Sequence, residues 1–111
     1  SPDRRWLLTD TYPGKDGRRG LILYDLERAR RLDVGRFYAM PDVVTGEIRC
    51  DLHPRWSRDG RRLCFDSVHE GTRQIYVMDV GAVVGRGVKV DVRGALVGSK
   101  SSAARVDWKL V

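Results

Sequence analysis

Long hydrophobic runs are missing from this 111-residue sequence, and several motifs that carry chemistry are missing too. No apolar stretch reaches the roughly 18 residues that a membrane-spanning helix needs, so we expect no membrane partner. The sequence contains no G-x-S-x-G segment, no glycine-rich phosphate loop and no C-x-x-C pair. These absences leave the serine hydrolase, nucleotidase and zinc-ribbon classes without support.

Cysteine is scarce, with only Cys50 and Cys64 in the chain. We expect the turn SRDG to join two strands in which Trp56 opposes Arg62. Cys64 would then face Pro54, about 13 Å along the sheet from Cys50. That separation exceeds the reach of a disulfide. We therefore predict two reduced thiols, with Cys64 a small buried hydrophobic residue.

Acidic residues are the minority, because the formal net charge is +6 and 17 of the 21 basic residues are arginine. The planar arginine fork fits carboxylates and phosphates, which suits an acidic oligosaccharide as a partner. The alternative is that the arginines are spread over solvated strands and turns. No run exceeds two consecutive basic residues and no aromatic platform is interleaved with them. Nucleic-acid binding therefore ranks below the other functions.

The sequence does contain short apolar runs separated by turn-rich segments. In the stretch CDLHPRWSRDGRRLCFDSVHEGTRQIYVMDV, residues 50–80, the turns SRDG and HEGTR divide three such runs. This pattern is typical of antiparallel strands in a meander, and we predict strands at 52–56, 62–66 and 74–79. Pro54 suits an inner edge strand, and we expect it to hold His53 extended.

The same pattern occurs twice, 56 residues apart. Ser1-Pro2-Asp3 aligns with Ser57-Arg58-Asp59, and the segment LILYDL (21–26) aligns with IYVMDV (75–80). Strands are accordingly predicted at 5–11, 21–26 and 31–37, with an exposed loop at 11–20. A helical turn is an alternative for 27–32. Repeats with only β periodicity favour stacked sheets of the propeller kind, because each sheet needs neighbours to cover both its faces.

The repeated pattern WSxDG…L.F.S….G…IYV.D resembles a blade of the TolB-type β-propellers. Within that group, CDLHPRWSRDG followed by CFDSVHEG and RQIYVMD resembles the oligogalacturonide lyase-like propellers, over about residues 1–80. The resemblance implies an all-β fold of antiparallel four-stranded propeller blades. About two blades fit into this length.

We divide the chain into three parts on this basis. Residues 1–49 form a first blade without its inner strand, followed by a long connection. Residues 50–97 form a second blade with an outer strand at 88–92, and residues 98–111 are either a tail or an additional closing strand. Rings of blades typically contain four to eight, so we expect a fragment or an oligomer-completed propeller. Further blades would come from copies of this chain or from a longer chain.

Propeller topology places one set of loops at a single rim, which is where ligands usually enter. The resemblance implies a divalent metal there, such as Mn²⁺ or Ca²⁺, held by histidines and a glutamine. It also implies a lyase reaction in which a base removes the proton beside a uronate carboxylate. His53 matches the family's metal-bearing segment. Asp51 stands where the family has a second histidine, and Ile48 stands in place of the glutamine.

The candidate metal ligands are therefore His53 and Asp51, and the candidate substrate-binding residues on the same rim are Arg49, Arg55 and His69. No catalytic residue is assigned, and we expect little or no catalysis from two blades alone. Both histidines also have a structural interpretation, since one adjoins a proline and the other lies in a turn. The alternative function is a non-catalytic propeller scaffold that binds protein or saccharide through this rim.

Overall fold

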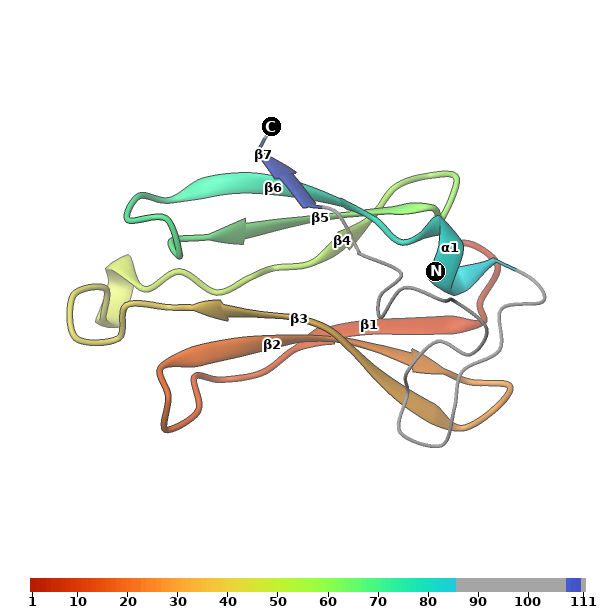
Figure 1. The fold of residues 1–111 in the computed structure, drawn as a ribbon, viewed down its shortest axis with the longest axis horizontal. Coiled ribbons are helices and arrows are strands. Elements are labelled where there is room, and N and C mark those ends of the chain that lie inside the picture. The colour runs from red at the N-terminus through yellow and green to blue at the C-terminus, as the bar shows by residue number, and fades with distance from the viewer. Residues whose placement is uncertain (86–107, 111) are drawn as a thin grey trace, which may run out of the picture.

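The computed structural model describes residues 1–85 and 108–110, which form two antiparallel sheets stacked one on the other (Figure 1). The first sheet consists, in order, of β1 (Trp6–Asp10), β2 (Arg18–Asp25) and β3 (Arg30–Tyr38). The second consists of β4 (Arg55–Trp56), β5 (Arg62–Ser67) and β6 (Gln74–Asp79), and the short β7 (Trp108–Leu110) adds at the β6 edge. The only helical elements in the described ranges are η1 (Gly46–Ile48) and α1 (Gly81–Val84). The prediction of an all-β fold is confirmed.

Most predicted strands are found close to their expected positions. Strands β5 and β6 match the predicted ranges 62–66 and 74–79, and β3 replaces the alternative helical turn. Strand β2 starts at Arg18, inside the segment expected to be a loop, because Arg19 pairs with Phe37 of β3. The strand expected at 88–92 lies outside the described residues. Among the helices described, none has the length and apolarity to cross a membrane.

The predicted inner strand at 52–56 is interrupted by a bulge. Only Arg55 and Trp56 pair regularly with β5, whereas the Asp66 amide donates to the Leu52 carbonyl (2.8 Å), one residue out of that register. His53 has φ of +41°, so the expectation that Pro54 holds it extended is wrong. The Arg55 guanidinium donates to the His53 carbonyl (2.9 Å) and thereby stabilises the bulge.

The turn before β5 also differs from the prediction by one residue. Trp56 faces Leu63 instead of Arg62, and Cys64 faces Arg55 instead of Pro54. The reason is a wider turn at Ser57–Gly60, closed by a 3.0 Å bond from the Gly60 amide to the Ser57 carbonyl.

Both cysteines are free, as predicted. Cys50, however, is the buried one, and Cys64 is only half-buried, with its sulfur 3.2 Å from a guanidinium nitrogen of Arg55. The prediction that Cys64 is a buried hydrophobic residue is therefore wrong. The one-residue change in register is the cause, since it moves Cys64 opposite a charged side chain.

The two repeats begin with the same hydrogen-bonded turn. The Ser57 hydroxyl accepts from the Arg62 amide at 3.0 Å, and Ser1 does the same for Trp6 at 2.9 Å. The carboxylates of the two turns accept in the same way from the amides two residues later. Asp59 accepts from Arg61 (3.0 Å), and Asp3 accepts from Arg5 (3.1 Å). The sequence repeat at a spacing of 56 is thus also a structural repeat.

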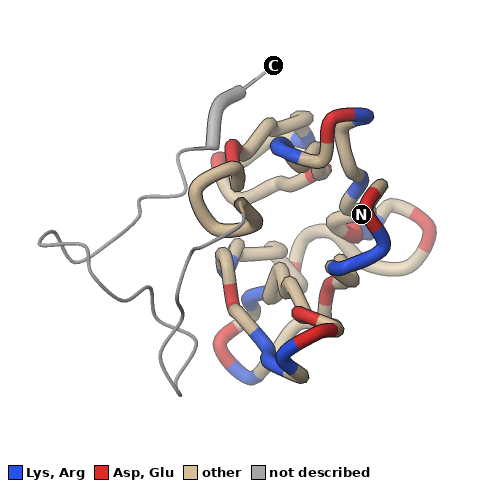
Figure 2. The backbone as a smooth tube through the Cα atoms, turned by 90° about the vertical axis from the view of Figure 1, so that its right-hand side faces the viewer, with Lys and Arg blue, Asp and Glu red and all other residues tan. Residues whose placement is uncertain are grey.

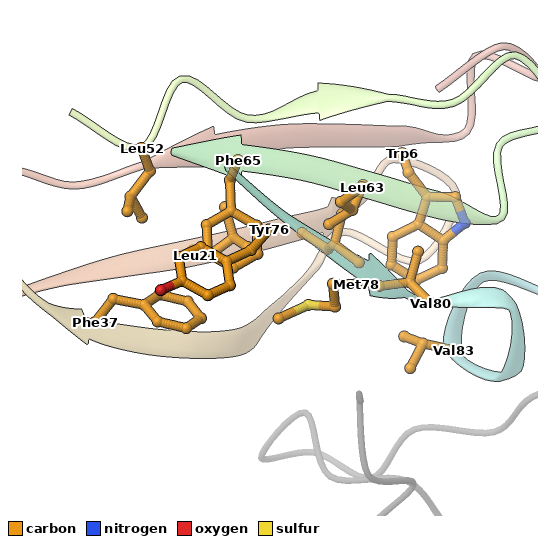
Figure 3. Packing of buried hydrophobic residues seen from close by; sticks show 11 residues of the cluster. Trp6, Leu21, Phe37, Leu52, Leu63, Phe65, Tyr76, Met78, Val80 and Val83 are labelled. Atoms are coloured by element: carbon orange, nitrogen blue, oxygen red, sulfur yellow. The ribbon is translucent and has the colours of Figure 1, made fainter. Parts of the chain in front are cut away.

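A single hydrophobic core lies between the sheets (Figure 3). Its aromatic centre joins Phe37 of the first sheet to Phe65 of the second at 4.7 Å, with Tyr76 5.6 Å from Phe65. The remaining members are Trp6, Leu21, Leu23, Leu52, Leu63, Met78, Val80 and Val83. Full burial of one such side chain contributes about 1.5–3 kcal/mol, so the contact between the sheets dominates the stability of the fold.

Candidate functional site

One end of the stacked sheets carries an open pocket of about 210 Å³. It forms where the end of β1, the loop after it, the start of β2 and the connection before β4 meet. We call it the rim pocket, and its lining residues are Asp10, Thr11, Tyr12, Arg19, Asp51 and His53. Two residues predicted for the metal site, Asp51 and His53, thus lie at one pocket.

Arg19 is the buried charge of this pocket, with only 6% of its side chain exposed. It occupies the second position of β2, where the strand holds its backbone opposite Phe37. One guanidinium nitrogen lies 2.7 Å from an oxygen of Asp51, and another donates to the Thr11 carbonyl at 3.2 Å. The Nε atom is buried and has no hydrogen-bond partner among the described residues. The guanidinium also lies 5.9 Å from the ring centroid of Tyr12.

Asp51 is held by two arginines. Its Oδ1 faces Arg19, and its Oδ2 lies 3.3 Å from Nε of Arg49. The neighbouring residue is fixed as well, because the Leu52 amide donates to the Asp10 carboxylate at 3.2 Å. These contacts tie the connection before β4 to the first sheet, which positions His53 at the edge of the pocket.

The loop between β1 and β2 folds back on itself at the pocket. The Gly20 amide donates to the Thr11 hydroxyl (2.8 Å), and the Thr11 amide donates to the Gly20 carbonyl (3.0 Å). Tyr12 follows this clasp and is 77% exposed. An aromatic ring therefore stands at the mouth of the pocket, directly beside a buried guanidinium.

The pocket does not suit the metal that the family resemblance implies. No group of three or more His, Cys, Asp or Glu side chains that could hold a metal occurs within residues 1–85 and 108–110. Both oxygens of Asp51 already face guanidinium groups, so a cation there would have to displace them and would meet two positive charges. The described residues therefore do not fit a divalent cation.

None of the three predicted substrate-binding residues is part of the lining of the pocket. Arg55 contacts the main chain of His53, but its guanidinium pairs with Asp66 at 3.1 Å. Arg73 pairs with the other oxygen of Asp66 at 3.3 Å, so Arg55 belongs to an ion-pair cluster on the second sheet. Arg49 lies beside the pocket through its contact with Asp51.

His69 is packed into the structure instead of facing the rim pocket. Its ring lies 5.1 Å from Phe37 and 4.6 Å from Tyr76, centroid to centroid, and Nδ1 lies 2.7 Å from the Ser67 hydroxyl. Burial lowers the pKa of His69, and the nearby carboxylate of Glu70 partly offsets this. These contacts match the structural interpretation of this histidine.

The sequence interpretation missed the two side chains that give the pocket its chemistry, Arg19 and Tyr12. Arg19 was missed because the sequence predicted a loop around it, whereas residues 18–25 form strand β2. Tyr12 left a usable signal, since an aromatic residue in a loop rich in glycine and charge is a typical contact for a ligand. The arrangement can pair with a carboxylate and stack against a flat or ring-shaped ligand.

Comparison with known proteins adds no relative to this picture. Searches of protein-family models and of curated protein sequences found no match to the chain.

Proposed function

We propose that this chain forms two consecutive blades of a TolB-type propeller resembling the oligogalacturonide lyase-like group, and that the rim pocket binds an acidic carbohydrate. One observation carries the proposal: a buried guanidinium, Arg19, lines an open pocket with an exposed ring, Tyr12, beside it. The charge of Arg19 is paired with Asp51, but its Nε donor has no hydrogen-bond partner in the part of the chain described, and a buried donor without a partner is costly.

The chemistry of a uronate suits this pair of side chains. Its carboxylate can accept hydrogen bonds from a guanidinium edge, and the C–H face of its ring can lie against an aromatic side chain. The carboxylate of Asp51 keeps Arg19 oriented in the absence of ligand. Arg49 adds a second positive charge next to the same carboxylate.

The function proposed for these residues is binding, and no catalytic step is assigned to them. The metal-assisted elimination implied by the family requires a ligand set that the described residues do not assemble. If the complete assembly is a lyase, its metal ligands come from other blades. Saccharide binding without catalysis is also the alternative function that the sequence analysis gave for this rim.

Isothermal titration of the chain with oligogalacturonates of defined length tests the proposal. We expect Tyr12→Ala to weaken binding about two- to tenfold, because an aromatic contact of this kind contributes about 0.5–1.5 kcal/mol. Arg19→Gln should weaken it by more than about tenfold, since it removes the charge-assisted bonds. The matched control is Arg58→Gln, which removes an exposed arginine in the turn before β5.

Each outcome of the titration decides the question. Binding of oligogalacturonate but not of a neutral oligosaccharide of equal length, lost in Tyr12→Ala and retained in Arg58→Gln, supports the proposal. Equal affinity for the neutral and acidic sugars contradicts it, and so does unchanged affinity in Tyr12→Ala. Tyr12 is highly exposed, so its substitution does not depend on the fate of the buried Arg19–Asp51 pair.

A further inference from the structure

The two repeats bury opposite faces of equivalent strands. Leu21 in β2 is 0% exposed, whereas Ile75, its counterpart in the repeat, is 47% exposed. The reverse holds for the preceding strand, where Leu63 is 1% exposed and its counterpart Leu7 is 53% exposed. The face that forms the core in one repeat is therefore the face left free in the other.

Strand register defines the two free faces. The outer face of the first sheet carries two cross-strand pairs, Leu7 with Tyr24 and Thr9 with Ile22. The outer face of the second sheet carries Cys64 paired with Val77 and Asp66 paired with Ile75. Side chains alternate between faces along a strand, so these residues point to the outer faces. Ile22 (7% exposed) and Asp66 (9%) are nevertheless buried there, and the other six are half-buried or exposed. Figure 1 shows the two sheets stacked, with these faces on the outside of the stack.

The packing inside the chain indicates what fits each free face. The core joins the Leu21 face of the first repeat to the Leu63 face of the second. Two faces remain free. In the first sheet it is the face that carries Leu7, the residue equivalent to Leu63. In the second sheet it is the face that carries Ile75, the residue equivalent to Leu21. A contact between these two free faces would repeat the contact that already forms the core.

The charges on the free faces are compatible with this contact. The outer face of the first sheet has an exposed ion pair, Arg31 with Asp33 at 2.7 Å, at its β3 side. The outer face of the second has the Asp66 carboxylate held by Arg55 and Arg73. Basic and acidic positions are interspersed along both sheets (Figure 2), and these ion pairs give each outer face charges of both signs. Apolar side chains with paired charges around them are typical of a protein interface.

We propose that the outer face of the first sheet of one copy docks on the outer face of the second sheet of another copy, head to tail. Such a contact is heterologous, and it produces a ring when the rotation between successive copies closes. Rings of four to eight blades would take two to four copies of a two-blade chain. The proposal rests on the blade-pair part of the proposed function and does not depend on the rim pocket binding any ligand.

Sedimentation and light scattering of the full chain at micromolar concentration test the proposal with two charge substitutions. Leu7→Asp alters the outer face of the first sheet, and Ile75→Asp alters the outer face of the second. Both positions are about half exposed in a single copy, so a lone copy can fold with either change. We expect each variant alone to associate about tenfold or more weakly, because a desolvated charge would face an apolar surface. Val43→Asp, at an exposed position in the connection between the sheets, is the matched control.

An equimolar mixture of the two variants gives the decisive result. The Leu7→Asp copy keeps an intact second outer face and the Ile75→Asp copy keeps an intact first one, so together they form a single good contact. We expect the mixture to give a dimer of one copy each that does not grow further. A wild-type chain that stays monomeric at these concentrations overturns the proposal. A mixture no more associated than its separate components overturns it as well. Oligogalacturonate titration of the same samples shows separately whether the rim pocket is functional.

Discussion

At the scale of single residues, the two turns that open the repeats differ at one position. Gly60 has φ of +70° in the second turn, and Arg4 occupies the equivalent place in the first turn with φ of +61°. Both turns form the same bond, from this residue's amide to the carbonyl of the serine three residues earlier, at 3.0 Å. Left-handed backbone is costly for a residue with a Cβ atom, so Arg4 holds strain that Gly60 does not.

Replacing Arg4 with glycine should therefore stabilise the protein. We expect Arg4→Gly to raise the free energy of unfolding by about 0.5–1 kcal/mol, because relief of strain outweighs the greater flexibility of glycine in the unfolded chain. The reciprocal change, Gly60→Ala, should lower it by about 1 kcal/mol or more. Equilibrium denaturation in urea measures both. A destabilised Arg4→Gly variant would contradict the argument.

His69 makes the stability depend on pH. Burial lowers its pKa below the ordinary value of about 6.5, so as the pH falls the unfolded chain takes up this proton before the folded chain does. The contribution of His69 is complete above about pH 6.5 and is lost as the pH falls below it. We expect the free energy of unfolding to decline less between about pH 7 and pH 5 in His69→Gln than in the wild type. Identical slopes for the two proteins in urea titrations would show that this proton is not linked to folding.

At the scale of elements, the pair Arg19–Asp51 joins β2 to the connection that leads into β4. Asp51→Asn would leave the guanidinium of Arg19 buried without its carboxylate. We expect a loss of about 3 kcal/mol in the free energy of unfolding, since breaking a buried ion pair costs more than the pair itself contributes. Thermal and urea denaturation in chelator-treated buffer measures this loss and excludes a metal as its cause.

A double variant provides the control for the Arg19–Asp51 prediction. Arg19→Gln with Asp51→Asn removes both charges and should recover a large part of the loss, with a coupling energy of about 1–3 kcal/mol between the two positions. Additive effects would mean that the two side chains do not depend on one another. The exposed pair Arg31–Asp33 offers a comparison, because a solvated pair of the same kind contributes only about 0–1 kcal/mol.

The sequence predicted the regular strands better than their junctions. Alternating apolar residues and flanking turns identified β5 and β6, because the positions buried on the core side follow the period of a strand. The bulge at His53 was not predictable in this way, since it depends on the Arg55 guanidinium bonding to a carbonyl two residues earlier. Contacts of this kind between side chain and backbone leave no periodic pattern in the sequence.

The candidate site was predictable only in part, for a related reason. Asp51 and His53 were found because they adjoin a recognisable strand segment, and they do line one pocket. Arg19 is 32 residues away from Asp51 along the chain, and only the folded connection brings their side chains to 2.7 Å. The same contact changes the role of Asp51 from a candidate metal ligand to the partner of a guanidinium.

At the scale of the whole molecule, the stacking of the two repeats determines which of two equivalent residues is buried and so contributes more to the free energy of unfolding. The pairs Leu21 and Ile75, and Leu63 and Leu7, are matched by the repeat but differ in burial. Truncating the buried members, in Leu21→Ala and Leu63→Ala, should each cost about 2–5 kcal/mol in the free energy of unfolding.

Truncating the exposed members, in Ile75→Ala and Leu7→Ala, should each cost less than about 1 kcal/mol, because these side chains already lie half in water in a single copy. Denaturation at submicromolar protein concentration measures the lone copy. Raising the concentration should then make the exposed-face variants fall further below the wild type, since association stabilises only the faces that remain intact. Equal losses for the two members of a pair at low concentration would mean that the sheets do not stack by opposite faces, and the head-to-tail contact would lose its basis.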